Sequence, residues 1–247
     1  MTLRVQIPGV CGRGPHNAAG LAKEFPAVSY FPSSEQTRPV AEGRLASGLL
    51  GKVFGLLAFS LAFATAGGWV GAQIGTAWFF PLVIAEFALI FVVRAVREKE
   101  GLNLVALYAF AFVSGMTLGP IVAQYTSAGL GSAVLEAGAI TGVMTVALSA
   151  YALVTKRDLS GLRPYLFMAL IGLIVVMVLN IFVGGTVLET AVSWAGALLF
   201  SVLLVFDVNR AKYAPDTMGN AVMLTLGIYL DIVNLFLFVL RIIGGGR

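Results

Sequence analysis

Two aspartates near the C-terminal end of the sequence are the side chains best suited to chemistry. Asp207 and Asp231 each lie inside an apolar run, and a short polar turn around Gly219 joins the two runs. Both aspartates are equally far from Gly219, so helices folded back at this turn would hold the carboxyl groups at similar depths. Two carboxyl groups at one depth in a medium of low dielectric constant cannot both ionise cheaply. We therefore expect the pair to share a proton, bind a cation or contact a base.

Two arginines could compete for this pair. Arg210 follows Asp207 by three residues, so a local ion pair at a helix end is the simplest interpretation for Asp207. It leaves Asp231 without a partner, and Arg97, at the end of another apolar run, is the other base that could reach this depth. We hypothesise a gate in which ionised Asp207 holds Arg97 and closes the inner end of a pathway, whereas protonation releases it. Because neighbouring carboxyl groups titrate together, the gate is expected to respond near physiological pH.

Three more polar side chains in apolar runs are candidates for an ion pathway. Glu86 lies deep in its run and could face a cavity or make a neutral structural hydrogen bond. Glu136 lies only a few residues inside its run and could simply reach the membrane interface. Asn234 follows Asp231 by three residues and extends a polar stripe along the same helical face. A charge near mid-bilayer costs at least ~2.5–3.5 kcal/mol on insertion scales, so acids within spans are functional candidates.

The elements that must position these side chains are membrane helices. The chain has 247 residues, of which 59% are hydrophobic and 11% charged, and its mean hydropathy is +0.93. A soluble domain carries about 25% charged residues. Seven apolar runs approach the ~20 residues that span a bilayer, which predicts an all-α integral membrane protein with seven transmembrane helices. We expect them at residues 49–74, 79–97, 102–125, 132–154, 163–184, 190–211 and 219–241.

The basic residues predict the orientation of these helices. All but two of the 16 lysines and arginines lie in the N-terminal region or near alternate connections. Cytoplasmic loops carry such an excess, so the N-terminus is expected in the cytoplasm and the C-terminus outside, with a re-entrant last segment as the alternative.

Residues 1–46, with five prolines and no sustained apolar period, are expected to form a polar, disordered tail before the membrane domain of residues 47–247. No dense basic stripe indicates a nucleic-acid partner.

The composition also limits the chemistry of the spans. Cys11 and His16, the only cysteine and histidine, lie in the N-terminal tail, so we expect no catalytic dyad and no resident cofactor. An intramembrane aspartyl protease is harder to exclude, because it also uses one aspartate on each of two adjacent helices. The contexts VFDVN and YLDIV differ from the Tyr-Asp and Gly-x-Gly-Asp patterns of those enzymes. We therefore expect a protein that is not an enzyme.

Four segments of the sequence are distinctive: FAFVSGMTLGPIV ending at Val122, TKRDLSGL after the fourth run, FDVNR around Asp207, and the closing YLDIVNLFLFVLRIIG. Together they resemble the Bax inhibitor-1, or transmembrane Bax-inhibitor-motif, family, and within it the bacterial YetJ-like proteins. The resemblance covers about residues 50 to 244, and the closing segment is its most specific part. It implies a seven-helix fold whose last helix is central and wrapped by the other six.

The resemblance also implies a pH-sensitive calcium leak with a di-aspartyl sensor. The sensor matches Asp207 and Asp231, and an arginine latch on the second helix matches Arg97. The chain reads RAVREKE there where bacterial relatives have a basic run, so Arg94 is the alternative latch. Calcium is then the expected transported ion, with the two aspartates as its oxygen ligands, and the proton the expected regulator. The expected partner is the lipid bilayer, and the expected location is a bacterial plasma membrane.

An alternative from another functional class remains open. The chain could be a membrane interaction protein that modulates stress responses without conducting ions. Its intramembrane acids would then only lock the helix bundle. Ion flux through the pure protein distinguishes the two hypotheses.

Overall fold

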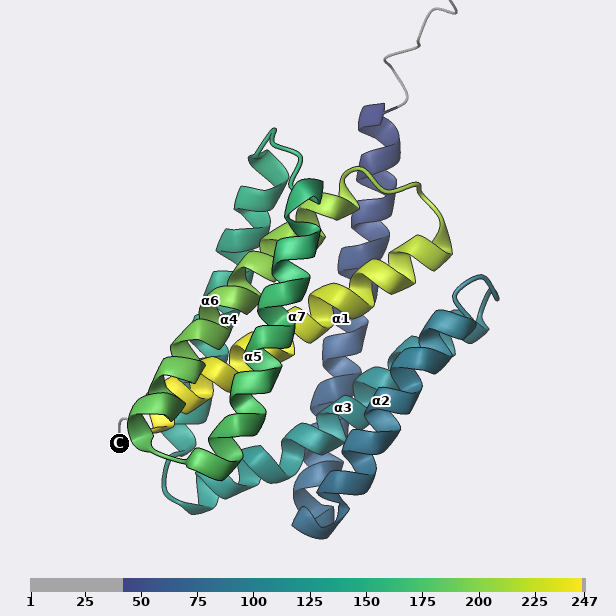
Figure 1. Cartoon of the computed structure of the whole chain (residues 1–247). Helices are drawn as coiled ribbons and strands as arrows, with labels where there is room; N and C mark the ends of the chain where they lie inside the picture. Colours follow the sequence, from purple (N-terminus) through teal and green to yellow (C-terminus); the bar gives the residue numbers. More distant parts are fainter. Residues whose placement is uncertain (1–41, 246–247) are drawn as a thin grey trace, which may run out of the picture. The chain divides into compact units, whose positions relative to one another are not determined.

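The fold consists of long α-helices joined by short connections (Figure 1). It is a computed structural model, and it describes residues 42–245. The α-helices are α1 (Glu42–Ile74), α2 (Phe79–Ala95), α3 (Leu102–Ser127), α4 (Gly131–Val154), α5 (Arg163–Val183), α6 (Thr186–Ala211) and α7 (Met218–Gly245). Short 3-10 turns, Thr76–Trp78 and Ser160–Leu162, lead into α2 and α5.

Seven helices of the described part are long and apolar enough to cross a membrane, which confirms the predicted all-α fold. Most helix ends lie within a few residues of the predicted spans. The largest difference is the start of α1 at Glu42, before the predicted residue 49, and α6 also starts earlier, at Thr186, while α7 ends later, at Gly245. Of the predicted tail, residues 1–41 lie outside the described residues, and its last five residues begin α1. The division into tail and membrane domain therefore stays a prediction.

Two glycines explain why α6 begins earlier than the hydropathy predicts. Gly184 and Gly185, between α5 and α6, adopt φ angles of 66° and 106°. Residues other than glycine rarely adopt positive φ, so this pair reverses the chain within two residues. The next helix then starts at once, although its first turn contains the polar residues Thr186 and Glu189.

Helices α1 and α3 approach each other closely through small residues. A Cβ atom at Gly115 of α3 would overlap the backbone of Ala64 in α1, and one at Gly71 of α1 would overlap the backbone of Met116. Glycines at this spacing let helix backbones pack closely in lipid, where no hydrophobic effect drives them together.

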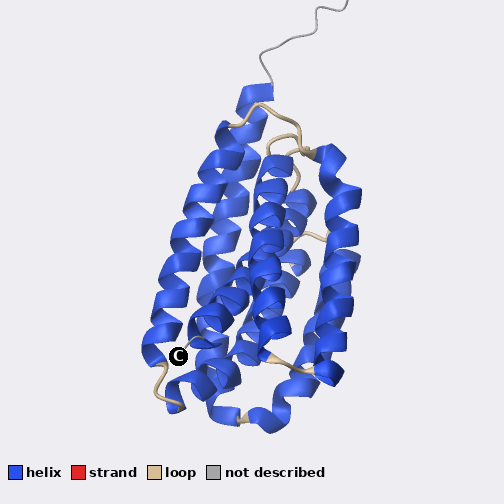
Figure 2. Cartoon of the chain, turned by 60° about the vertical axis from the view of Figure 1, so that its left-hand side comes forward, coloured by secondary structure: helices blue, strands red, loops and turns tan. Residues whose placement is uncertain are grey.

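Helix α7 is the most buried span. Within its most apolar window 67% of the residues are buried, against 6% for α2 and for α5. It packs against α1, α3, α4 and α6, and Figure 2 shows these long helices turned to a second view. The complete wrapping of α7 by all six other helices stays a prediction.

Two apolar clusters meet along α7. The first includes Tyr229 and Ile232 together with residues of α1, α3 and α6. The second includes Leu235 and Phe238 together with residues of α4, α5 and α6. Asp231, near the middle of α7, therefore lies among residues of the first cluster and one helical turn before the second cluster begins at Leu235.

Candidate functional site

Asp231 is the most deeply placed acid of the described spans. Its residue is 6% exposed, and its Oδ2 atom has no hydrogen-bond partner. A buried polar atom without a partner costs free energy, and more so when it carries charge. Such a carboxyl group is suited to taking up a proton or a cation.

Asp207 approaches the same level of α7 from α6. Its carboxyl group lies against Gly227, where a Cβ atom would overlap Oδ2 of Asp207. Gly227 is one helical turn before Asp231, so the glycine leaves room for Asp207 on the face that carries Asp231. The two carboxyl groups are close enough to act on each other electrostatically. The structure thus brings together the two aspartates that the sequence singled out.

Two cations lie near Asp207. Arg210 Nη1 is 3.7 Å from Asp207 Oδ1, which is the local ion pair considered from the sequence. Arg163, at the start of α5, also acts electrostatically on Asp207. Arg163 and Asp207 line the polar end of a groove of ≈ 490 Å³ between α5 and α6, whose apolar part includes Phe167 and Leu203. The groove connects the Asp207 carboxyl group with the outside of the bundle.

Sequence reasoning missed Arg163 as a neighbour of this site. The available signal was its position just before the fifth apolar run, on the same predicted side as Arg210. The approach of α5 to α6 brings it near Asp207, and that approach depends on tertiary packing.

The two predicted latch residues lie elsewhere in this structure. Arg97 is exposed, and its Nε atom pairs with Glu98 Oε1 at 3.0 Å. Its carbonyl oxygen accepts a hydrogen bond from Asn103 Nδ2 at 3.0 Å and lies against Gly219 at the start of α7. Arg94 is exposed on α2. The partner of Asp207 is therefore Arg210 here, and a latch formed by Arg97 or Arg94 stays a prediction.

Glu86 belongs to a second polar cluster. It is partly buried on α2, within hydrogen-bonding reach of Ser114 and Thr117 on α3. Tyr229 of α7 also contacts Ser114, and its hydroxyl group donates to the carbonyl oxygen of Ala111 at 3.4 Å. The cluster thus links α2 and α3 to α7 two residues before Asp231.

The other two pathway candidates are placed differently. Glu136 is exposed on α4. Asn234 is partly buried, and its Nδ2 atom donates to the carbonyl oxygen of Leu230 at 2.7 Å, within α7 itself. A role for Glu136 or Asn234 in an ion pathway stays a prediction.

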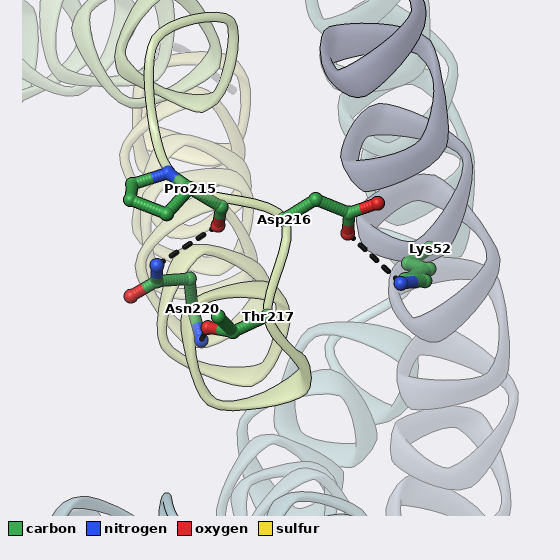
Figure 3. A network of polar contacts seen from close by, with 5 residues as sticks. All are labelled: Lys52, Pro215, Asp216, Thr217 and Asn220. Atoms are coloured by element: carbon green, nitrogen blue, oxygen red, sulfur yellow. Dashed lines mark hydrogen bonds and ion pairs between the residues drawn. The ribbon is translucent and has the colours of Figure 1, made fainter.

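The turn before α7 is fixed by a polar network (Figure 3). Lys52 Nζ of α1 pairs with Asp216 Oδ1 at 2.9 Å. Thr217 Oγ1 accepts from the backbone N–H of Asn220 at 3.2 Å, as a capping side chain does at a helix start. Asn220 Nδ2 donates to the carbonyl oxygen of Pro215 at 2.9 Å. The entry into the helix that carries Asp231 is therefore tied to α1.

The end of α6 is tied to the α4–α5 connection. Asn209 Oδ1 accepts from the backbone N–H of Leu159 at 3.2 Å, and Asn209 Nδ2 donates to the carbonyl oxygen of Arg157 at 3.1 Å. Lys212 Nζ donates to the carbonyl oxygen of Thr155 at 2.6 Å, at the end of α4. The FDVNR segment thus combines Asp207 with the asparagine that holds its helix in place.

Asp158 in this connection is a carboxylate of another kind. The hydroxyl group and backbone N–H of Ser160 both donate to it, at 2.5 and 2.9 Å, and they hold the pKa of Asp158 below its ordinary value. It is therefore ionised throughout the physiological range, and its charge does not change where a proton sensor must respond.

The described residues contain no group of three or more His, Cys, Asp or Glu side chains that could hold a metal ion. Calcium takes 6–8 oxygen ligands in stable protein sites. The Asp207–Asp231 pair supplies two carboxyl groups, fewer ligands than a stable calcium site uses.

Comparison with known proteins gives concordant matches. The family model described as "Inhibitor of apoptosis-promoting Bax1" matches residues 46–247. A protein of Helicobacter pylori strain 26695 is 36% identical over 192 residues, which are 75% of this chain and 81% of that protein. A membrane protein of Vibrio cholerae is 33% identical over 79% of this chain and 88% of its own length. Inner membrane protein YbhL of Escherichia coli K12 is 33% identical over 67% of this chain and 74% of its own length.

Proposed function

The chain belongs to the Bax inhibitor family whose model matches residues 46–247, and we propose that it is a calcium leak channel or transporter gated by protonation of the Asp207–Asp231 pair. The match confirms the family resemblance seen in the sequence. The observation that carries the proposal is the carboxyl pair itself, in which Asp207 lies against Gly227 and the Oδ2 atom of Asp231 has no partner. The proposal assigns the chain no catalytic reaction and no resident cofactor.

The gate works through competition for Asp207. When ionised, this carboxyl group attracts the arginines around it, Arg210 in this structure and Arg97 in the latched state inferred from the family. Protonation removes the attraction and frees the inner end of the pathway. In the open state Asp231, an oxygen ligand of the kind calcium prefers, lies on the path of the ion.

We place the protein in a bacterial plasma membrane with its N-terminus in the cytoplasm. The distribution of lysine and arginine supports this orientation, and the relative YbhL is named an inner membrane protein. The α6–α7 turn and Asp207 then lie toward the cytoplasm, so the gate senses cytoplasmic protons.

Calcium flux into liposomes that contain the purified protein tests the proposal. The wild type is expected to pass calcium in a pH-dependent manner, with potassium and proton reporters run in parallel. Asp207→Asn and Asp231→Asn keep the side-chain size but remove the titration, so each should abolish most of the pH-dependent change in flux. Asp158→Asn is the matched control, because Asp158 is exposed outside the spans and its variant should behave as wild type.

Unchanged flux and pH response in both aspartate variants would refute the gate. A pure protein that passes no calcium, whose aspartate variants lose only thermal stability, would favour the interaction protein without ion flux.

The same flux assay shows which of the two arginines, Arg97 or Arg210, closes the proposed gate. Loss of closure in Arg97→Gln but not in Arg210→Gln identifies the latch, whereas the reverse result assigns closure to the local pair.

A further inference from the structure

A polar groove lies at the end of the bundle opposite the α6–α7 turn. It consists of two adjoining pockets of ≈ 170 and ≈ 380 Å³, and Glu189 of α6 and Arg241 of α7 line both. The end of α5, the start of α6 and the end of α7 meet here, so the groove opens at the level of the lipid headgroups. Trp194, which lines the smaller pocket, is the kind of residue that gathers at a membrane interface.

The charged groups of this groove are not paired with each other. Among the described residues no ion pair joins Glu189 to Arg241. The guanidinium group of Arg241 lies 6.0 Å from the ring centroid of Phe238, which leaves its N–H donors available. Asn180 of α5 lines the larger pocket, and its Oδ1 atom is buried without a hydrogen-bond partner. The groove therefore presents one cation and two acceptor groups.

The rest of the larger pocket is apolar. Ile174, Val178 and Ile181 of α5 line it and are exposed on the outside of the bundle. A molecule that fills the groove therefore meets charge at its head and aliphatic side chains along its body. This is the arrangement of a membrane amphiphile.

From this geometry we propose that the groove binds a zwitterionic phospholipid whose headgroup carries a primary ammonium, as in phosphatidylethanolamine. Arg241 binds the phosphate, and the ammonium donates to Glu189 and to Asn180 Oδ1. The acyl chain lies along Ile174 and Val178. A quaternary ammonium has no N–H with which to satisfy Asn180, and an anionic headgroup without an ammonium meets repulsion from Glu189. This site is independent of the proposed calcium flux.

Native mass spectrometry of the detergent-solubilised full chain tests the site. The protein is mixed with equal amounts of phosphatidylethanolamine, phosphatidylcholine and phosphatidylglycerol of matched acyl chains. We expect one tightly bound phosphatidylethanolamine, favoured about tenfold over the other two, since a charge-assisted hydrogen bond is worth about that ratio. Equal binding of the three lipids, or a preference for phosphatidylglycerol, overturns the proposal.

Three variants divide the headgroup into its parts. Glu189→Gln and Asn180→Leu should each lose the preference for phosphatidylethanolamine over phosphatidylcholine, whereas Arg241→Gln should weaken binding of all three lipids. Lys156→Gln, an exposed cation outside the spans, is the matched control and should keep the wild-type preference. Retention of the preference in both Glu189→Gln and Asn180→Leu refutes the ammonium site. The melting temperature of each lipid-free variant shows that the bundle is intact.

Discussion

At the scale of single residues, the glycine beside Asp207 matters as much as the acids. An aspartate on α6 can approach the face of α7 that carries Asp231 only where that face has no side chain in the way. Gly227 provides this space, because its missing Cβ would occupy the position of the Asp207 carboxyl group. The mutual influence of the two acids therefore depends on a residue that carries no charge.

Gly227→Ala should consequently separate the carboxyl pair. A helical alanine is normally more stable than glycine by roughly 0.5–1 kcal/mol, and the atoms that its methyl group would meet are the end of the Asp207 side chain, which can rotate away. The stability should therefore change little, whereas the pH response of calcium flux should weaken because the two carboxyl groups move apart. Thermal unfolding in detergent and the liposome assay measure the two effects.

Gly138→Ala is the control for this change. Gly138 lies in α4, and a Cβ atom there would meet nothing within 4 Å. Equal pH responses in the two alanine variants would show that Gly227 does not set the spacing of the pair.

The sequence predicted some of this site and not the rest. Asp207 and Asp231 could be paired because their equal distance from Gly219 fixes their depth. Gly227 could have been found as a small residue one turn before Asp231. For Arg163 the sequence could predict only the side of the membrane that it shares with Arg210. Its approach to Asp207 depends on how α5 packs against α6, and the hydropathy of a lipid-facing helix contains little information on its neighbours.

At the scale of elements, the entry into α7 is held by one long-range contact. Lys52 and Asp216 join α1 to the α6–α7 turn (Figure 3). A Cβ atom at Gly48, one turn before Lys52, would contact the Asp216 carboxyl group at 2.7 Å. The turn therefore lies directly on α1, and its position depends on both shape and charge.

Exchange of the two charges tests this contact. Lys52→Asp and Asp216→Lys should each lower the stability by up to about 1 kcal/mol, the range of partly exposed ion pairs, because each places like charges together. The double variant should recover most of the loss. Melting temperatures at low and high salt measure it, and strictly additive losses in the double variant would show that the pair contributes no coupling.

The helix boundaries likewise include some that the local sequence predicts and some that depend on backbone conformation or on distant residues. The hydropathy placed all seven spans because each contains enough apolar residues to cross a bilayer. It missed the first turn of α6, which is polar and is fixed by the backbone of Gly184 and Gly185. The hydrogen bonds by which Asn209 of FDVNR holds the end of α6 also could not be predicted from the local sequence, since its partners lie about fifty residues away.

At the scale of the whole membrane domain, the helices that bury least have apolar outer surfaces, as contact with a bilayer requires. Helices α2 and α5 bury little within the described part, and large apolar side chains such as Phe182, which is 82% exposed, lie on its surface. In water such surfaces would associate, whereas in lipid they contact acyl chains. Of the buried polar side chains, Thr225 and Asp231 belong to α7, the helix on which the proposed gate depends.

Under the proposed function, the orientation of this domain decides which compartment the aspartate pair would sense. Helix α7 is continuous over 28 residues, or ~42 Å at 1.5 Å per residue, which exceeds the ~30 Å hydrocarbon core. A full seventh span is therefore favoured over a re-entrant segment, and it places the C-terminal end of α7 across the membrane from the α6–α7 turn.

Labelling of single cysteines with a membrane-impermeant maleimide tests both points. In a Cys11→Ser background, Ser127→Cys and Gly245→Cys should react in intact bacterial cells, because both positions are expected outside. Lys156→Cys should react only in inverted vesicles, since the cation-rich α4–α5 connection is expected in the cytoplasm. Reaction of Gly245→Cys together with Lys156→Cys would instead return the end of α7 to the cytoplasm. Complete reversal of all three would place Asp207 toward the outside, and the gate would then respond to external acid.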